Sequence, residues 1–351
     1  MSSMPAFQFA NPPVIHWGAN SLEQLAAELK RLHTRRPVIV TTRSLMDEAR
    51  RLPLRPAADS PVTVLISQHA PLQEIESAIH DAEGADVDGV VSFGGGSPID
   101  AAKILAVRIA EHRGNTERAL PHVAIPTTLS VAELAAGAGF TDEAGTKGGM
   151  RDPRLLPDSV IYDAQMTLKT PMQLWLSTGV RALDHAVEGF LADGEHPFSD
   201  VMALEAVRRL FATLPQAKAR PQDLDVRTQN QLAAWFSFTL PGASASGLSH
   251  MMGKQIGARH RIPHGVTSCL LLPHVMRYLT ALKPERMQVL ATATGAGHDA
   301  AGDVERLISS LGLPQHISEF GIGEPELRVA ASELGGKYPQ ADLLNIYTEA
   351  L

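Results

Sequence analysis

Short apolar runs alternate with helix-like segments from the N-terminus to about residue 165. After an extended lead-in at 6–17, runs of mostly β-branched residues cover 37–41, 62–66, 89–93 and 122–128. Runs without polar alternation are typical of strands buried on both faces. Helical spacing lies between them, for example at about 72–83 and at 22–32, where Ser21 is a candidate N-cap. Strands that alternate with helices predict a doubly wound parallel sheet.

The pattern changes near residue 165, after which every periodic segment has helical spacing. Just before the change, 141–163 contains loop and strand material with a hairpin signal around Gly145. The predicted helices then cover 171–193, 199–213, 225–240, 244–258, 265–280, 284–293, 302–312, 314–320 and 325–335, with a short one after Gln340. We therefore predict an α/β domain at 1–165 and an all-helical domain at 166–351.

Composition and charge exclude several classes of function. The chain has 351 residues, of which 44% are hydrophobic and 20% charged, as is ordinary for a globular protein. Its net charge of −7 and the lack of a basic stripe argue against nucleic-acid binding. The single cysteine, Cys269, allows no internal disulfide. Neither a signal peptide nor a membrane-length apolar stretch is evident, so we expect a cytoplasmic protein without a membrane partner.

The third apolar run is followed by three glycines, Gly94, Gly95 and Gly96, and then by Ser97 and Pro98. Glycine lets the backbone approach a ligand closely. The next helix, with Pro98 at its predicted first position, offers free N–H groups at its N-terminus. Together these features predict a pyrophosphate cradle. The segment matches neither the GxGxxG fingerprint nor a Walker A loop, so a plain tight turn is the alternative.

Two adjacent hydroxyl residues, Thr127 and Thr128, end the run at 122–128. Ligands of doubly wound folds bind at the carboxyl ends of the parallel strands, so these side chains are candidates for nucleotide contacts. Simple capping of the turn is the alternative interpretation.

Histidines occur in two apolar helical segments of the second half, where each needs a polar partner. The candidate residues are His185 and Glu188 in one segment, and His250, Lys254 and His264 in the other. A spacing of four residues places His250 and Lys254 on one helix face. We predict that His185, His250 and His264 form one shared site. For a single core histidine, above all His260 or His274, a hydrogen bond to a backbone carbonyl is the alternative.

Five ordered segments resemble one known family. They read GGGSPIDAAK, IPTTLSVAE, GTKGGMRDPRLLPDSVIYD, STGVRALDHAVEG and GLSH…IPHGVTSCLLLPHV. Together they are similar to the iron-containing (group III) alcohol dehydrogenases, and the third is most similar to the maleylacetate reductase branch. The resemblance implies a dehydroquinate synthase-like fold, with a dinucleotide-binding α/β domain, an all-helical domain and an active site in the cleft between them. It also implies a homodimer.

The resemblance further implies a set of cofactor-binding residues for NAD(P)H. The pyrophosphate would lie on Gly94, Gly95, Gly96 and Ser97, and the rest of the cofactor near Thr42, Asp100, Thr127, Thr128, Leu129 and Lys147. NAD-preferring relatives often hold an aspartate at the position of Thr42. Because no carboxylate stands there to repel a 2′-phosphate, and Arg43 is adjacent, we expect NADPH to be accepted, together with NADH.

At the metal site the sequence departs from the family. His185, His250 and His264 match the three histidine ligands of iron or zinc, but Arg181 stands where the family has an aspartate. Lys254 replaces a histidine that relays protons near the substrate. Metal ligands are neutral or anionic, so two added cations disfavour a bound metal, although three histidines hold zinc in other folds. Asp184 is a weak substitute ligand, expected to point away from His185.

The leading functional hypothesis is hydride transfer from NAD(P)H to the carbonyl of a small oxo-acid, as the maleylacetate reductase resemblance implies. Arg181 and Lys254 would stabilise the developing oxyanion, and Lys254 or a histidine such as His250 would supply the proton. Arg181 could instead clamp a substrate carboxylate. The alternatives are a metal-dependent alcohol or aldehyde dehydrogenase, a non-redox lyase or cyclase, and a non-catalytic dinucleotide-binding protein.

Overall fold

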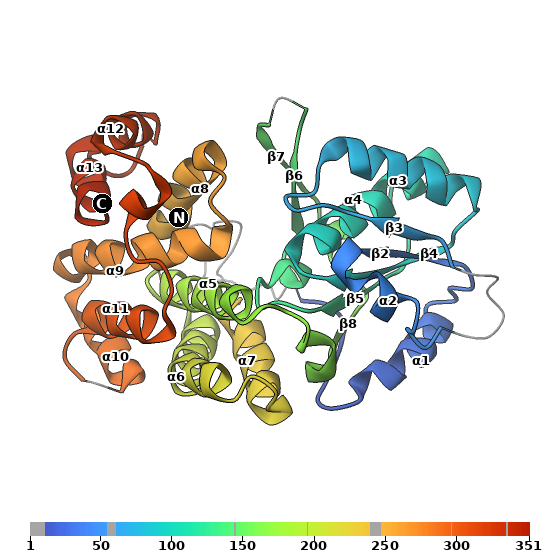
Figure 1. Cartoon of the computed structure of the whole chain (residues 1–351), viewed down its shortest axis with the longest axis horizontal. Helices are drawn as coiled ribbons and strands as arrows, with labels where there is room; N and C mark the ends of the chain where they lie inside the picture. The colour runs from blue at the N-terminus through green and yellow to red at the C-terminus, as the bar shows by residue number, and fades with distance from the viewer. Residues whose placement is uncertain are drawn as a thin grey trace, which may run out of the picture. The chain divides into compact units, whose positions relative to one another are not determined.

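The computed structural model describes residues 11–54, 61–143, 145–194, 196–238, 247–295, 297–334 and 336–351. These residues form two compact units that meet in sequence between Thr170 and Pro171. The first unit combines a sheet with helices and the second is helical (Figure 1). The predicted domain boundary at residue 165 falls slightly earlier, inside the 3-10 helix η5 (Ala164–Thr167).

The first unit is built on a six-stranded sheet in which every pairing is parallel. In the order β1-β8-β5-β4-β2-β3, its strands are Val14–Trp17, Ser159–Tyr162, His122–Pro126, Gly89–Gly94, Pro37–Thr41 and Thr63–Leu65. The prediction of a doubly wound parallel sheet is confirmed. All residues of β2, β4, β5 and β8 are buried, which explains why their sequences are continuous apolar runs.

Helices cover both faces of this sheet (Figure 1). Val38, Val40 and Val90 pack under α3 (Leu72–Gly84) and α4 (Gly96–His112). Residues of the same strands that point the other way pack with α1 (Leu25–Arg31) and α2 (Met46–Ala49). The remaining short 3-10 helices of this unit are η1 (Ser21–Gln24), η2 (Arg43–Leu45), η3 (Ala132–Leu134) and η4 (Pro153–Leu155). Alternate strand residues thus feed two separate cores.

A β-hairpin projects from this unit, made of β6 (Gly137–Thr141) and β7 (Lys147–Arg151) in antiparallel register. Gly145 lies in its turn with φ of +79°, in the left-handed region that favours glycine. The predicted hairpin around Gly145 is confirmed.

Two local predictions in the α/β unit are wrong. Ser21 does not cap a helix: it lies within η1, and its hydroxyl donates to the carbonyl of Tyr162 at 3.1 Å. Helix α4 begins at Gly96, so Pro98 is its third residue and not its first. Pro98 still fits there, because the first turn of a helix has no intrahelical partner for its N–H groups.

The second unit contains only helices in its described part, as predicted. They are α5 (Met172–Phe190), α6 (Pro197–Ala219), α7 (Leu224–Ser237), α8 (Leu248–His260), α9 (His264–Leu282), α10 (Pro284–Thr294), α11 (Ala300–Leu311), η6 (Ile317–Phe320), α12 (Glu324–Glu333) and α13 (Gln340–Glu349). The predicted helix ends at 239–240 and 244–246 lie outside the described residues. Every residue from Trp175 to Phe190 is buried, which makes α5 the core helix of this unit.

Among the described helices, none combines the length and the apolar character needed to cross a membrane.

Candidate active site

The carboxyl edge of the sheet has a topological switch point between β2 and β4. From β2 the chain continues to β3 on one side, and from β4 it continues to β5 on the other. Ligands of open α/β sheets bind outside the carboxyl ends of two such strands, because the loops there diverge. Thr42 directly follows β2, and Gly94 ends β4. The predicted cofactor residues therefore begin at the expected place in the sheet.

The glycine turn after β4 depends on glycine for two reasons. Gly94 has φ of +151°, and a Cβ there would lie 2.6 Å from Cγ of Pro98. A Cβ at Gly95 would lie 3.0 Å from Cγ2 of Thr128, which is tighter than ordinary contact. No side chain covers the turn at these glycines, and residues 95–97, at the start of the 17-residue helix α4, are partly exposed. Such a helix start binds phosphate groups.

Side chains around the turn connect neighbouring loops to α4. Ser97 Oγ accepts a hydrogen bond from the backbone N–H of His69 at 2.9 Å. Asp100 accepts one from the backbone N–H of Gly139 at 3.0 Å, and burial raises the pKa of Asp100 to about 6. The hydroxyl of Ser97 keeps its own proton and can donate it to a second acceptor, such as a phosphate oxygen.

Lys103, which the sequence analysis did not select, fixes the chain that follows β5. It is 1% exposed and donates to the carbonyls of Ala132, Ala135 and Gly137, the last two at 2.7 and 2.9 Å. Burial lowers the pKa of Lys103, opposed by the charge of Asp100. The lysine thus ties α4 to η3 and to the start of the hairpin.

The other predicted cofactor residues of this unit lie next to the glycine turn or on the hairpin. Thr127, Thr128 and Leu129 are buried, and the N–H of Thr127 donates to the carbonyl of Gly94 at 2.9 Å. Lys147 lies on β7, and its charge adds to burial in lowering the pKa of His69. The structure thus brings the turn, the threonines and Ser97 together, whereas Asp100 and Lys147 connect with the hairpin and its neighbouring loop.

In the helical unit, three helices bring the predicted histidines together. The ring centroid of His250 on α8 lies 6.1 Å from that of His185 on α5 and 6.5 Å from that of His264 on α9. His264 is the first residue of α9, and a Cβ at Gly265 would lie 2.8 Å from backbone atoms of Ser177 on α5. Glycine at 265 therefore lets α9 begin close against α5.

Arg181 lies within this histidine cluster. Its side chain is only 8% exposed, and its Nη2 contacts Nδ1 of His250. Its Nη1 donates to Oδ2 of Asp184 at 3.1 Å and to Oγ of Ser268 at 3.1 Å. Burial, followed by the charges of Arg181 and His264, lowers the pKa of His185 well below its usual value. The neighbouring cation therefore favours a neutral His185.

Asp184 is the counter-ion that the sequence analysis missed. It is fully buried, and its Oδ2 accepts hydrogen bonds from Ser249 at 3.1 Å and Ser268 at 2.6 Å, besides the one from Arg181. From the sequence, Asp184 was considered only as a weak substitute metal ligand that points away from His185, and not as a partner of Arg181. The spacing of three residues between Arg181 and Asp184 on one helix was the available signal.

Glu188 positions α8. Its carboxylate oxygens accept the backbone N–H groups of Gly247 at 3.0 Å and of His250 at 2.9 Å, at the first turn of that helix. A Cβ at Gly247 would lie 2.5 Å from Cδ of Glu188, so glycine is needed for this approach. Burial raises the pKa of Glu188 well above its usual value, and Asp184 adds to the effect. Glu188 therefore fixes the backbone that carries His250.

Lys254 differs from Arg181, with which it was paired in the sequence analysis. It lies one turn after His250 on α8, but its side chain is exposed. His274 lies outside the cluster, where its Nδ1 is 3.8 Å from Glu349 and 3.3 Å from Nη1 of Arg277. These contacts of His274 are made to side chains, whereas the alternative interpretation from the sequence was a hydrogen bond to a backbone carbonyl.

The side chains at the cluster do not fit a bound iron or zinc ion. A ligating imidazole must direct a nitrogen lone pair at the metal. Here the guanidinium of Arg181 lies against Nδ1 of His250 and adds a permanent positive charge. Across the described residues, no group of three or more His, Cys, Asp or Glu side chains could hold a metal ion. The hypothesis of a metal on His185, His250 and His264 thus conflicts with the arrangement around Arg181.

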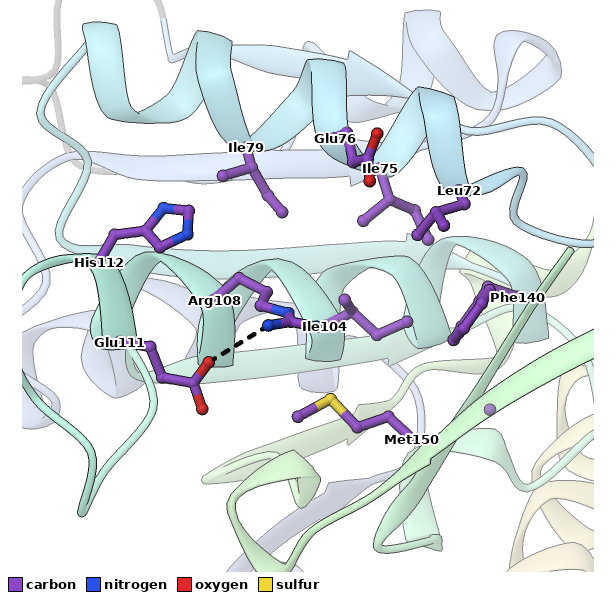
Figure 2. A pocket seen from close by; sticks show the side chains of 11 residues that line it. Leu72, Ile75, Glu76, Ile79, Ile104, Arg108, Glu111, His112, Phe140 and Met150 are labelled. Carbon is purple, nitrogen blue, oxygen red and sulfur yellow. Dashed lines mark ion pairs between the residues drawn. The ribbon is translucent and has the colours of Figure 1, made fainter. Parts of the chain in front are cut away.

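A separate pocket of about 540 Å³ lies in the α/β unit (Figure 2). Apolar side chains of α3, α4 and the hairpin line it, together with Arg108 and Glu111, whose charged groups are 3.7 Å apart. None of the predicted cofactor residues is among its lining residues. The pocket is therefore distinct from the glycine turn.

Comparisons with known proteins support the fold and identify the family. The model of the iron-containing alcohol dehydrogenase family matches residues 12–164, and the model of its C-terminal part matches 175–336. The chain is 32% identical to the maleylacetate reductase of Pseudomonas sp. (strain P51), over 93% of this chain and 90% of that one. It is 34% identical to maleylacetate reductase 2 of Cupriavidus pinatubonensis, over 83% and 79%. The solved maleylacetate reductase from Agrobacterium tumefaciens superimposes with a TM-score of 0.89 at 28% identity, covering 99% of this chain and 98% of that one.

Proposed function

The chain belongs to the iron-containing alcohol dehydrogenase family, and we propose that this oxidoreductase passes a hydride from NAD(P)H to a small oxo-acid, as a maleylacetate reductase does. The observation that carries the proposal is the buried guanidinium of Arg181 at the histidine cluster. A cation in that position suits an anionic substrate better than a neutral one.

The cofactor half of the proposal rests on the glycine turn. The pyrophosphate of NAD(P)H would bind the free N–H groups at the start of α4, with Ser97 as a further donor. Thr42 and the exposed Arg43 follow β2, at the position where a carboxylate would select against a 2′-phosphate. We therefore expect NADPH to bind as well as NADH.

The chemical half rests on charge at the substrate's carbonyl oxygen. Hydride addition at the carbonyl carbon leaves negative charge on that oxygen, and addition at a conjugated carbon of an unsaturated oxo-acid leaves it on the same atom. A fixed donor that meets this charge stabilises the transition state. Arg181 has Nη1 engaged with Asp184, so Nη2, next to His250, is the group available for the oxygen. His250 is the nearest candidate proton donor.

Substrate carboxylates supply the second reason for a cationic site. The exposed ammonium of Lys254, one turn beyond His250 on α8, could meet a carboxylate away from the reacting carbon. In this arrangement Arg181 acts on the reacting oxygen and Lys254 on binding. The homodimer implied by the family resemblance stays a prediction.

The test compares two substrates at one site. Oxidation of NADPH is followed by absorbance with maleylacetate and with a neutral aldehyde of similar length, for the wild type and for Lys254→Met. We expect turnover of the oxo-acid to exceed that of the aldehyde, and the substitution to raise the KM for the oxo-acid alone. Equal rates for both substrates in the wild type would refute an oxo-acid reductase and favour a general alcohol dehydrogenase.

A further inference from the structure

Arg181 and Asp184 form a buried ion pair on one face of α5. The side chain of Arg181 is 8% exposed and that of Asp184 is not exposed at all. Hydroxyl groups from two other helices complete the pair, Ser249 from α8 and Ser268 from α9, and both donate to Oδ2 of Asp184. One carboxylate oxygen therefore accepts from three donors on three helices, which fixes its position.

The pair defines where the guanidinium points. Nη1 of Arg181 is engaged with Asp184 and Ser268, so Nη2 is directed at His250 within the three-histidine cluster. A long arginine side chain has many rotamers, and hydrogen bonds from Nη1 to two acceptors, Asp184 and Ser268, restrict them. Without the carboxylate, the buried cation would lose its compensating charge and would favour a more hydrated position.

We propose that Asp184 is a positioning residue that holds the Arg181 guanidinium at the histidine cluster, so that a fixed organic cation occupies the place a divalent metal would otherwise take. The proposal rests on the proposed function, because it gives the guanidinium the task of meeting the substrate's oxygen. It goes further in assigning the loss of metal binding to a pair of residues. Arg181 supplies the charge, and Asp184 keeps that charge among the histidines.

A second buried aspartate serves as a control, to distinguish a positioning role of Asp184 from a purely structural one. Asp303 on α11 is also a buried aspartate of the helical unit, 4% exposed, and it pairs with an arginine three residues away, Arg306, which follows it in sequence. It further accepts from the hydroxyl of Thr294. Asp184→Asn and Asp303→Asn therefore remove the same charge from a buried aspartate paired with an arginine, at the cluster and away from it. The pairs differ in the arginine, whose side chain is 65% exposed for Arg306 and 8% exposed for Arg181.

The experiment measures cobalt binding and catalysis on the full-length protein. Co²⁺ is titrated into the wild type, Asp184→Asn and Asp303→Asn, and bound metal is detected by its visible absorption and by metal content after gel filtration. His264→Ala, made both in the wild type and in the Asp184→Asn background, shows whether the histidines hold the metal. The kcat and KM for NADPH and for maleylacetate are measured on the same samples, with melting temperature as a record of folding.

The expected result separates the two aspartates. Asp184→Asn releases the guanidinium, gains one histidine-bound Co²⁺ per chain, and loses at least tenfold in kcat with little change in the KM for NADPH. Asp303→Asn and the wild type bind no cobalt at the histidines, and Asp303→Asn keeps its kcat. The inference is overturned if Asp184→Asn takes up no more cobalt than Asp303→Asn, or if the wild type already binds cobalt that His264→Ala removes. Failure of the wild type to oxidise NADPH with oxo-acids would instead refute the proposed function, while the cobalt titration would still decide the role of Asp184.

Discussion

The glycine turn of the α/β unit depends on backbone groups, whereas the histidine cluster of the helical unit depends on side chains. The turn is made of backbone: Gly94 needs its positive φ, and the N–H groups of α4 are the proposed ligands. The cluster is made of buried side chains whose charges must balance, Arg181 against Asp184. A backbone site depends on space and conformation, whereas a charged site depends on every partner of each charge.

The largest expected effect comes from breaking the charge balance of the cluster. Arg181→Ala removes the proposed oxyanion donor, and losing one such donor costs about 10²–10³ in kcat. It also leaves Asp184 as an uncompensated buried carboxylate, at a cost of about 3–5 kcal/mol in the free energy of unfolding. Steady-state rates with maleylacetate and denaturant titrations measure the two effects. If the kcat of Arg181→Ala equalled that of the wild type, Arg181 would have no part in stabilising the transition state.

In the α/β unit, the comparison predicts that a side chain matters most where it supports backbone. Lys103→Met leaves the carbonyls of Ala132, Ala135 and Gly137 without their charged donor. We expect a loss of about 2–6 kcal/mol in the free energy of unfolding, since the carbonyls of Ala135 and Gly137 lose this donor at about 1–3 kcal/mol each, whereas that of Ala132 keeps the N–H of Ala135. Urea titration provides the measurement, with Lys30→Met, on the exposed part of α1, as the control. Equal stability of both variants would contradict the assigned role.

A third prediction tests the backbone character of the turn itself. Gly94→Ala puts a Cβ 2.6 Å from Pro98 at a φ that other residues rarely adopt. The strain amounts to about 1–3 kcal/mol, and we expect NADPH affinity to fall about tenfold as the turn distorts. Fluorescence titration with NADPH measures the affinity. Gly84→Ala, where a Cβ meets nothing within 4 Å, should leave it unchanged, and equal affinity of the two variants would show that the turn tolerates side chains.

The smallest predicted effect concerns a charge at the edge of the backbone site. Burial raises the pKa of Asp100 from 3.8 to about 6, so the folded state holds this proton more tightly than the unfolded state. Its contribution to stability is therefore full below pH 3.8 and decreases as the pH rises to about 6. In Asp100→Asn, the melting temperature should depend less on pH between these two values. The asparagine keeps an oxygen that accepts the hydrogen bond from the N–H of Gly139. An unchanged pH dependence would show that Asp100 titrates normally.

The sequence sufficed to predict most of the fold, because each element repeats its signal over several residues. Buried parallel strands read as continuous apolar runs, and the turn could be located because glycines must follow β4. Ser21 was misassigned because a serine before a helix is a common N-cap, whereas its partner, Tyr162, is distant in sequence.

The cluster was only partly predictable, because partners of buried charges come from different helices. The three histidines and Arg181 were selected correctly as neighbours, but Asp184 gains its role from Ser249 and Ser268, which only packing brings together. Lys254 shares a helix face with His250 in sequence terms, yet its exposure distinguishes it from Arg181. Helical spacing predicts which face of a helix a residue occupies, but not whether its side chain is buried or exposed.

The most direct test of a guanidinium-centred site is the oxidation of NADPH by maleylacetate with and without prolonged treatment by a strong chelator. Our account predicts rapid oxidation at the same rate in both samples, and no stimulation when Fe²⁺ or Zn²⁺ is added afterwards. Activity that is abolished by the chelator and restored by either metal would contradict it, because the histidines would then hold a metal in spite of Arg181.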